Sequence, residues 1–306
     1  MESAGNRPLR LGWVIGAIAV PLVVIGGWAG PARCASPSAA SQPASAPDLT
    51  GPLTRLRAKW LGDLGDDYSA ASRSPFLVVI QGDDAAARRW LTGTVVGAAE
   101  RMNKQFFAKR PDKPIVVLLF AGQESYRKAC KDLLAVPDPP HYGFCRPGEQ
   151  GMLLVMDINT GGGTLVHELF HALAAFDFPA IPDWFNEGAA SLYECCLYEE
   201  NRLVGMVNWR LPALQKAIRA DTLGSLEALT TCDFRGAKVG LNYAQARYLC
   251  QYLQDKGLLE RYYKTFRDNQ ADDLTGLKFL NQIVAPASLA EFEKAWRPWV
   301  LSLKQP

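Results

Sequence analysis

The stretch His167-Glu168-Leu169-Phe170-His171 decides how this 306-residue chain is interpreted, because it places two of the three histidines inside an apolar, helix-like segment. On an α-helix, residues i and i+4 lie on the same face, so both imidazoles can point at one ion. Glu168 is offset from His167 by about 100°, close enough to reach a water on that ion. Two core histidines on a buried helix are the alternative, but the H-E-x-x-H pattern favours a metal site.

A third protein ligand is expected downstream, because a catalytic zinc ion usually has three protein ligands and one open position. The segment Pro182–Ser191 supplies Glu187. Pro182 ends any secondary-structure element that precedes it. Asp183 is the expected N-cap of a helix that runs to about Tyr198. A Glu in a first helical turn is also favoured by the helix dipole alone. Its assignment as a ligand therefore depends on the upstream histidine pair.

These two segments together resemble the gluzincin metallopeptidases, the clan of thermolysin and the aminopeptidase N family. In that clan, H-E-x-x-H is followed by a second helix whose N-E-G or similar triplet supplies a zinc-binding Glu. Segments 167–173 and 184–194 match both parts, including Asn186-Glu187-Gly188, and look closest to short bacterial peptidase-MA-like domains of unknown function. The resemblance implies a Zn²⁺ ion bound by His167, His171 and Glu187.

The connection between the two motifs departs from the clan. Fifteen residues separate His171 from Glu187, fewer than in thermolysin or aminopeptidase N. A tight connection is therefore expected, and Pro179 and Pro182 fit a short turn between helices. The metzincin pattern H-E-x-x-H-x-x-G-x-x-H is excluded, because no Gly follows at the required place.

Two further roles come from the same resemblance. In the aminopeptidase N family, a Tyr that opens a helix stabilises the oxyanion of the tetrahedral intermediate. Tyr243 has the equivalent place in the order of elements, although Ala-Gln-Ala replaces the Glu-Lys-Gly that follows it in the family. Glu194, seven residues after Glu187, resembles the carboxylate that holds a ligand His through its other ring nitrogen. A packed Tyr and an ordinary exposed helix Glu are the alternatives.

The function implied is zinc-dependent peptide hydrolysis, with Glu168 as general base and Tyr243 as oxyanion donor. No P-loop, G-x-S-x-G elbow or C-x-x-C pair points to another chemistry. Two alternatives stay open: a catalytically degenerate gluzincin-like binding or scaffold domain of the cell envelope, and an anchored structural protein without metal.

The N-terminus indicates a location outside the cytoplasm. Arg7 and Arg10 precede the uncharged run Leu11–Gly30, which suits a signal peptide or a membrane anchor. Basic residues before such a run place the rest of the chain outside, so we expect a secreted, periplasmic or anchored domain. Residues 31–52 are rich in Ala, Ser and Pro and are expected to form a linker.

Residues 53–306 are expected to form the peptidase domain, with an α/β lobe over 53–180 and a helical lobe over 181–306. Strands before helices predict an α+β fold: a small mixed sheet with helices, the H-E-x-x-H helix lining a cleft, and a mostly helical C-terminal lobe. The expected strands are Phe76–Gln81, Pro114–Phe120, His141–Cys145 and Met152–Asp157, with a turn at Arg146-Pro147-Gly148 between the last two. The expected helices include Asp84–Lys109, Glu124–Leu134, one capped by Thr160 or Thr164 after Gly161-Gly162-Gly163, Pro212–Ala220, Leu223–Leu229, Asn242–Lys256, Leu258–Phe266 and Leu289–Leu303.

In thermolysin-like folds, the hairpin before the H-E-x-x-H helix presents a strand edge to the substrate. By that resemblance, Tyr142, Gly143 and Phe144 are expected to bind an extended peptide as an added strand. A plain hairpin with a covered edge is the alternative.

The net charge and the cysteine content indicate which kinds of binding partner and compartment to expect. The net charge of +2 gives no reason to expect nucleic acid, so a peptide or protein substrate is the expected partner, and the oligomeric state is left open. Seven cysteines are compatible with disulfides in an oxidising compartment. A Cys130–Cys145 bridge is conceivable, whereas Cys195 and Cys196, adjacent on an expected helix, need different partners or stay free.

Overall fold

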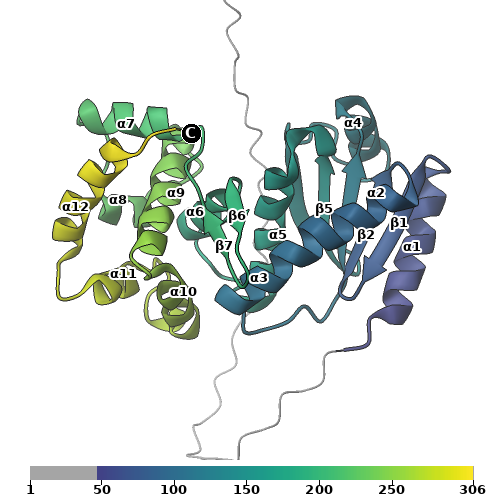
Figure 1. Cartoon of the computed structure of the whole chain (residues 1–306), viewed down its shortest axis with the longest axis horizontal. Helices are drawn as coiled ribbons and strands as arrows, with labels where there is room; N and C mark the ends of the chain where they lie inside the picture. Colours follow the sequence, from purple (N-terminus) through teal and green to yellow (C-terminus); the bar gives the residue numbers. More distant parts are fainter. Residues whose placement is uncertain (1–46, 306) are drawn as a thin grey trace, which may run out of the picture.

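The computed structural model describes residues 47–305, which form an α+β fold with a five-stranded mixed sheet and a helical C-terminal part. The expected signal peptide or anchor and most of the expected linker lie outside these residues. Helix α1 (Thr50–Leu64) begins within the stretch assigned to the linker. Figure 1 shows the sheet with helices α1–α5 on one side, helices α7–α12 on the other, and α6 with the β6–β7 hairpin between them.

The sheet has the strand order β1-β2-β3-β5-β4, so β1 and β4 are its edges. The three central strands are parallel, and both edge strands pair antiparallel to their neighbours. The strands are β1 (Tyr68–Arg73), β2 (Phe76–Gln81), β3 (Ile115–Phe120), β4 (Gly143–Gly148) and β5 (Gly151–Asp157).

The central strands read as continuous apolar runs because helices cover both faces of the sheet. Alternate residues face opposite layers: Val78 and Val117 pack with helices α3 (Gly97–Gln105) and α5 (Gly162–Asp177). Leu77 and Val116 pack on the other face with α1 and α4 (Gln123–Asp132). Helix α5, which carries the H-E-x-x-H stretch, is therefore fixed against the sheet by its apolar side.

The long helix expected over Asp84–Lys109 is shorter and irregular. It consists of α2 (Asp84–Arg89), a π-helical segment η1 (Trp90–Val96) and α3, which ends at Gln105. The helix ends there because Phe106 and Phe107 enter the core and the N–H groups of Ala108 and Lys109 donate to Asp177 instead. A tertiary contact overrides a sequence that favours helix.

The hairpin before α5 is present, but its turn is displaced from the expected place. Arg146-Pro147-Gly148 belongs to β4, and the turn is formed by Glu149 and Gln150. Proline is tolerated in β4 because this strand is at the edge of the sheet, where one side of the backbone needs no ladder hydrogen bond.

The C-terminal part is helical from α6 (Asp183–Leu192) onward, apart from the short hairpin β6 (Cys196–Tyr198) and β7 (Leu203–Gly205). Its helices agree with the expected ones to within a few residues, and α11 was not expected. They are α7 (Leu211–Arg219), α8 (Leu226–Thr231), α9 (Val239–Asp255), α10 (Leu259–Asp268), α11 (Leu277–Val284) and α12 (Leu289–Ser302).

Asp177, the last residue of α5, ties the sheet part to the helical part. Its carboxylate is 2% exposed and accepts hydrogen bonds from the Tyr263 hydroxyl at 3.1 Å and Arg267 Nη1 at 2.9 Å, both on α10. It also accepts from the N–H groups of Ala108 and Lys109. A buried carboxylate with four donors is fully compensated, so this network stabilises one arrangement of the two parts.

Helix α6 ends at Leu192, six residues before the expected end. The guanidinium of buried Arg247 on α9 takes up the carbonyl oxygens of Ser191 and Leu192 that the ended helix leaves free. Cys195 and Cys196 therefore do not share a helix, because Cys196 opens β6.

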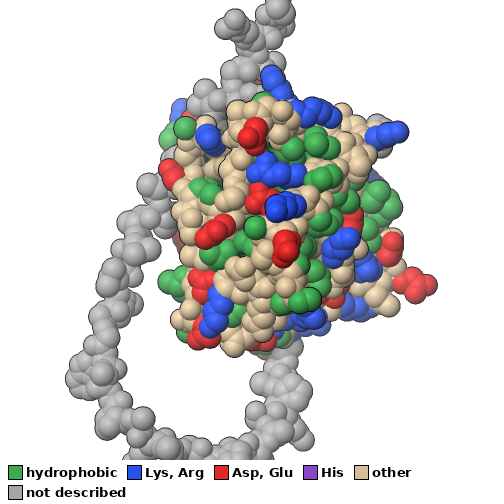
Figure 2. Space-filling model, turned by 90° about the vertical axis from the view of Figure 1, so that its left-hand side faces the viewer, with side chains coloured by type: hydrophobic (Ala, Val, Ile, Leu, Met, Phe, Trp, Pro, Cys, Tyr) green, Lys and Arg blue, Asp and Glu red, His purple; other side chains and the backbone are tan. Residues whose placement is uncertain are grey.

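All six cysteines of the described residues are free thiols. The conceivable Cys130–Cys145 bridge is not formed, since Cys130 is in the core on the α4 face of the sheet and Cys145 packs on the opposite face. Within residues 47–305, no helix is both long and apolar enough to cross a membrane. Figure 2 shows acidic, basic and apolar side chains interspersed over the face of the C-terminal helices.

Candidate metal centre

Two consecutive helices carry the centre. Helix α5 begins at Gly162, one turn before His167, and neither Thr160 nor Thr164 caps it: Gly161 is the N-cap, with φ 91° and no side-chain cap. Helix α6 begins at Asp183, with Pro182 rather than Asp183 as N-cap. Five residues connect the helices, so the expected tight connection is confirmed.

Helix α6 is held at short range from α9 by Gly188 of the Asn-Glu-Gly triplet. A Cβ atom at Gly188 would lie 2.9 Å from the carbonyl oxygen of Ala246 and 3.0 Å from its Cβ. Only glycine allows this approach without a shift of one helix. The contact places Glu187 beside the start of α9, where Tyr243 lies.

The structure brings together the three predicted metal ligands. The Nε2 atoms of His167 and His171 are 3.0 Å apart. The Oε2 atom of Glu187 is 3.3 Å from the first of these nitrogens and 3.4 Å from the second. Among the residues described, these side chains form the group that could hold a metal ion.

The spacing of these atoms fits a zinc ion. Zinc–ligand bonds of about 2.0–2.1 Å at tetrahedral angles place neighbouring ligand atoms about 3.3 Å apart. The three observed distances are 3.0, 3.3 and 3.4 Å. Glu187 Oε2 is buried and has no hydrogen-bond partner among the described residues. A buried carboxylate oxygen without a donor costs free energy, and a cation would remove that cost.

The outer nitrogens of both imidazoles face protein oxygens. His171 Nδ1 is 2.9 Å from Oδ1 of Asn186, and His167 Nδ1 is 3.1 Å from Oε1 of Glu194. At His171, the hydrogen-bond acceptor at Nδ1 keeps the proton on that nitrogen and leaves Nε2 free to bind a metal. At His167, the Glu194 carboxylate lies within ion-pair distance of Nδ1, although this nitrogen makes no hydrogen bond with the described residues.

Glu194 reaches His167 from a turn, not from the helix that the sequence predicted. Its backbone packs on the first turn of α5 at Gly163, where a Cβ atom would lie 2.0 Å from the carbonyl oxygen of Glu194. Gly163 and His167 are four residues apart and share a helix face. The glycine therefore admits the turn that holds the Glu194 carboxylate at the imidazole. The carboxylate is also bound by Arg210 Nη2 at 3.0 Å and Asn208 Nδ2 at 3.2 Å.

Glu168 is a buried residue of α5, the helix that contacts strand β4. Burial raises the pKa of its carboxyl group, the histidines oppose this shift, and Glu187 and Glu194 add to it. The Cys145 thiol of β4 is near enough that, after burial, the Glu168 charge raises its pKa as well. The residue predicted as general base is thus buried next to His167, and its pKa is shifted toward neutrality.

Tyr243 is adjacent to Glu187. Burial first, and then the Glu187 carboxylate, raise the pKa of the Tyr243 hydroxyl, so this group keeps its proton. Its ring lies between the Phe234 ring, with centroids 5.1 Å apart, and the Arg210 guanidinium at 5.1 Å. The neighbouring Tyr248 instead places its hydroxyl at the backbone of Asn208. Of these two tyrosines, Tyr243 is the one beside the metal-ligand group.

The opposite charges of the two imidazoles and the carboxylates shift one another's pKa values. Burial opposes protonation of His167, but its contacts with Glu187 and Glu194 outweigh burial and raise its pKa to about 10. The same happens in direction at His171, where Glu187 is the main opposing charge. Burial would raise the pKa of Glu187, yet the imidazoles hold it well below its usual value.

The three residues expected to contact substrate lie at the start of β4. Tyr142 is 46% exposed, directly before the strand. Gly143 has φ 157° and lies so close to Met156 that a Cβ atom would be 2.7 Å away. Phe144 packs on the α1–α4 side of the sheet, away from α5. The partly buried side chain of Phe144 therefore packs against the core on that side, so contact with a peptide beside α5 would come from the Tyr142 side chain or the strand backbone.

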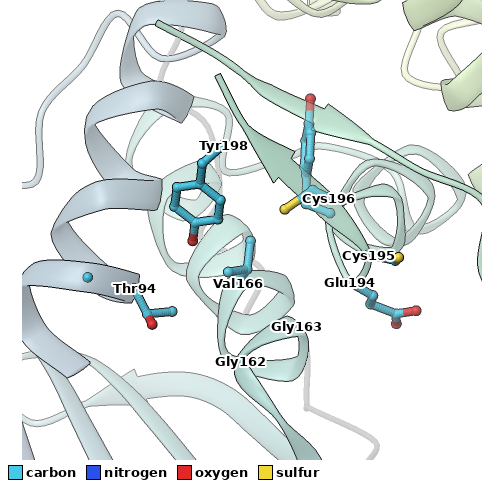
Figure 3. A pocket seen from close by; sticks show the side chains of 10 residues that line it. Thr94, Gly162, Gly163, Val166, Glu194, Cys195, Cys196 and Tyr198 are labelled. Carbon is cyan, nitrogen blue, oxygen red and sulfur yellow. The ribbon is translucent and has the colours of Figure 1, made fainter. Parts of the chain in front are cut away.

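A hollow of about 450 Å³ lies along the first turns of α5. It is bordered by η1, by α5, and by strand β6 with the turn before it; Thr94, Val166, Cys196 and Tyr198 are among the residues that line it (Figure 3). The Glu194 carboxylate points away from it in this view. The hollow and the metal-ligand group are thus on different sides of the Glu194 turn.

Four contacts of the centre were not predicted from the sequence, one of them the Asn208 amide at the Glu194 carboxylate. Asn186 was noted in its triplet without a role, although its position next to Glu187 was a signal. Arg210 and Arg235 bind the Glu194 and Glu187 carboxylates from the β7–α7 and α8–α9 connections. They are 16 and 48 residues away from those partners, so no local pattern links them.

The sequence was compared with known protein families and with curated proteins, and neither comparison gave a match.

Proposed function

We propose that this chain is a zinc-dependent peptidase of the gluzincin type, with His167, His171 and Glu187 as metal ligands. The observation that carries the proposal is the convergence of three donor atoms within 3.0–3.4 Å of one another. The Asn186 oxygen that is hydrogen-bonded to His171 Nδ1 and the Glu194 carboxylate 3.1 Å from His167 Nδ1 support it. The zincin-like assignment of the fold rests on the same elements: an H-E-x-x-H helix beside an edge strand, followed by a short helix with the third ligand.

A zinc ion held there supplies a Lewis acid beside a peptide carbonyl and activates a water. Glu168 takes a proton from the attacking water and delivers it to the leaving amine. Its raised pKa favours a carboxyl group that both accepts and returns a proton near neutral pH. The protonated Tyr243 hydroxyl donates a hydrogen bond to the carbonyl oxygen as negative charge develops on it.

The substrate proposed is a peptide or protein segment in extended conformation, bound along β4 by Tyr142, Gly143 and the backbone of Phe144. Strand β4 is an edge of the sheet and contacts α5, the helix that carries Glu168, so an added strand would run beside that helix. The N-terminal sequence supports a site of action outside the cytoplasm, with the domain secreted or anchored.

The test is metal content and hydrolysis of the full chain. We expect one zinc per chain after purification without chelators, and peptide cleavage that chelator abolishes and zinc restores. Glu168→Gln should keep zinc and lower hydrolysis by at least about a hundredfold, because the proton acceptor is lost. Glu227→Gln on exposed α8 is the matched control and should cleave normally.

Two outcomes would refute the proposal. A chain that takes up no zinc would rule out the metal site. A chain that binds zinc but cleaves no peptide would instead fit the degenerate binding domain.

A further inference from the structure

Arg235 bridges two carboxylates on one face of α6. Its Nη2 atom is 2.7 Å from Oε1 of Glu187, and its Nε atom is 2.8 Å from Oδ2 of Asp183. Asp183 and Glu187 are four residues apart, so both side chains lie on the same side of the helix. The planar guanidinium has donors in fixed directions and therefore reaches both carboxylates at once.

The loop that carries Arg235 is held in place. Phe234 is 5% exposed and packs on the ring of Tyr243, with centroids 5.1 Å apart. The side-chain amide of Asn242 donates to the carbonyl oxygen of Phe234 at 2.9 Å. The guanidinium is therefore delivered to Glu187 by a packed segment, although half of the Arg235 side chain faces solvent.

The two oxygens of Glu187 consequently have different environments. Oε1 accepts the hydrogen bond from Arg235, whereas Oε2 faces the two imidazoles without a hydrogen-bond partner among the described residues. A free carboxylate can bind a metal through one oxygen or through both. With Oε1 bound to a guanidinium, one protein oxygen is left for the ion.

We propose that Arg235 is a positioning residue that makes Glu187 a one-oxygen metal ligand and so keeps one coordination position free of protein atoms. The inference rests on the proposed metal site. Catalytic zinc sites need such a position, whereas purely structural sites are closed by protein ligands. Arg235 thereby determines whether this site is open or closed.

The sign of the change in metal affinity separates this role from simple structural support. Removing Arg235 takes away a positive charge that repels a cation and frees a second carboxylate oxygen, so both effects favour metal binding. If Arg235 only supported the fold of the site, its removal would weaken metal binding, as loss of outer partners commonly does, by about 10–100-fold.

The experiment measures Co²⁺ absorption and zinc affinity in the full-length Arg235→Met protein. We expect zinc to bind at least as tightly as in the wild type. The intense visible bands of four-coordinate Co²⁺ should weaken as Glu187 contributes its second oxygen. Arg235→Lys should retain the wild-type spectrum, because an ammonium group still reaches Oε1. Arg73→Met, which removes an exposed Arg–Glu100 pair with a 3.0 Å contact, is the matched control.

Two results would overturn the inference while leaving the peptidase proposal intact: an unchanged Co²⁺ spectrum in Arg235→Met, or weaker zinc binding. If Arg235→Met does not fold, Asp183→Asn removes the other anchor of the guanidinium and should shift the spectrum in the same direction. A spectrum identical to the wild type there would equally overturn it. A wild-type chain without zinc uptake would refute both proposals.

Discussion

Gly163→Ala tests the idea that one glycine positions the Glu194 turn. The added Cβ atom would be 2.0 Å from the Glu194 carbonyl oxygen and 3.0 Å from the carbonyl carbon. Ordinary contact begins near 3.4 Å, so the turn or the helix must move by about 1.4 Å. The Glu194 carboxylate is now 3.1 Å from His167 Nδ1, and a shift of that size would break this ion-pair contact.

Two quantities should change together in Gly163→Ala. Overpacking of this kind typically costs about 1–3 kcal/mol of unfolding free energy. For a domain of this size, that lowers Tm by about 2–12 °C. Loss of the outer partner of a histidine ligand should raise the zinc Kd by about 10–100-fold. Thermal unfolding of the metal-free protein and chelator competition measure the two effects separately.

The neighbouring glycine provides the control. A Cβ atom at Gly162 would be 3.9 Å from Cζ3 of Trp90, which is ordinary contact, so Gly162→Ala should keep the wild-type Tm or raise it slightly. Equal Tm and zinc Kd in the two alanine variants would refute the argument, because it assigns the whole difference to the contact with Glu194.

Three further predictions concern the donor, the proton balance and the buried network. Tyr243→Phe should lower kcat by about a hundredfold with little change in KM, because an oxyanion donor acts in the transition state; a change in Tm alone would show that the tyrosine only packs. Zinc affinity should rise about tenfold per pH unit between about pH 6.5 and 10, because zinc must displace the proton that His167, with its pKa of about 10, carries in the metal-free chain. Correspondingly, the stability that the protonated imidazole contributes to the metal-free protein is fully present below about pH 6.5 and is lost as the pH rises through about 10. Chelator competition at several pH values measures the affinity, and a flat profile would contradict this. Asp177→Asn should lower the free energy of unfolding by about 3 kcal/mol, because it leaves the Arg267 charge poorly compensated, and it should not change the zinc content. Urea unfolding and metal analysis measure the two quantities. Loss of zinc would show that the Asp177 network also shapes the metal site.

The sequence predicts best what is encoded locally. The i, i+4 spacing of His167 and His171 depends only on helix geometry, and the structure places both imidazoles together as expected. Strand Phe76–Gln81 is an apolar, partly β-branched run between turn residues, and its bounds are confirmed. The α+β class follows from such runs, because long periodic helices after short apolar strands leave few other layer arrangements.

The sequence did not predict elements that depend on contacts with distant residues, or elements whose residues have little preference for one secondary structure. Strand β1 contains Ala and Ser at its centre and forms by pairing with β2, so its own residues give little signal. Helix α1 was missed although Leu53, Leu56 and Trp60 have helical spacing, because Gly51 and Pro52 at its start resemble the preceding linker. The carbonyl oxygens left free at the early end of α6 are bound by Arg247, more than 50 residues later, and no local pattern could reveal this contact.

The Asp177 contacts also have a consequence for the order in which the chain is made. Arg267 is 90 residues and Tyr263 is 86 residues downstream of Asp177. During synthesis or export, the H-E-x-x-H helix emerges long before the residues that compensate the charge at its end. A partly made chain would have to bury that carboxylate with two of its four donors missing, which is unfavourable. We therefore expect the helix to dock stably only when nearly the whole chain is present, so that unfinished chains do not assemble the site.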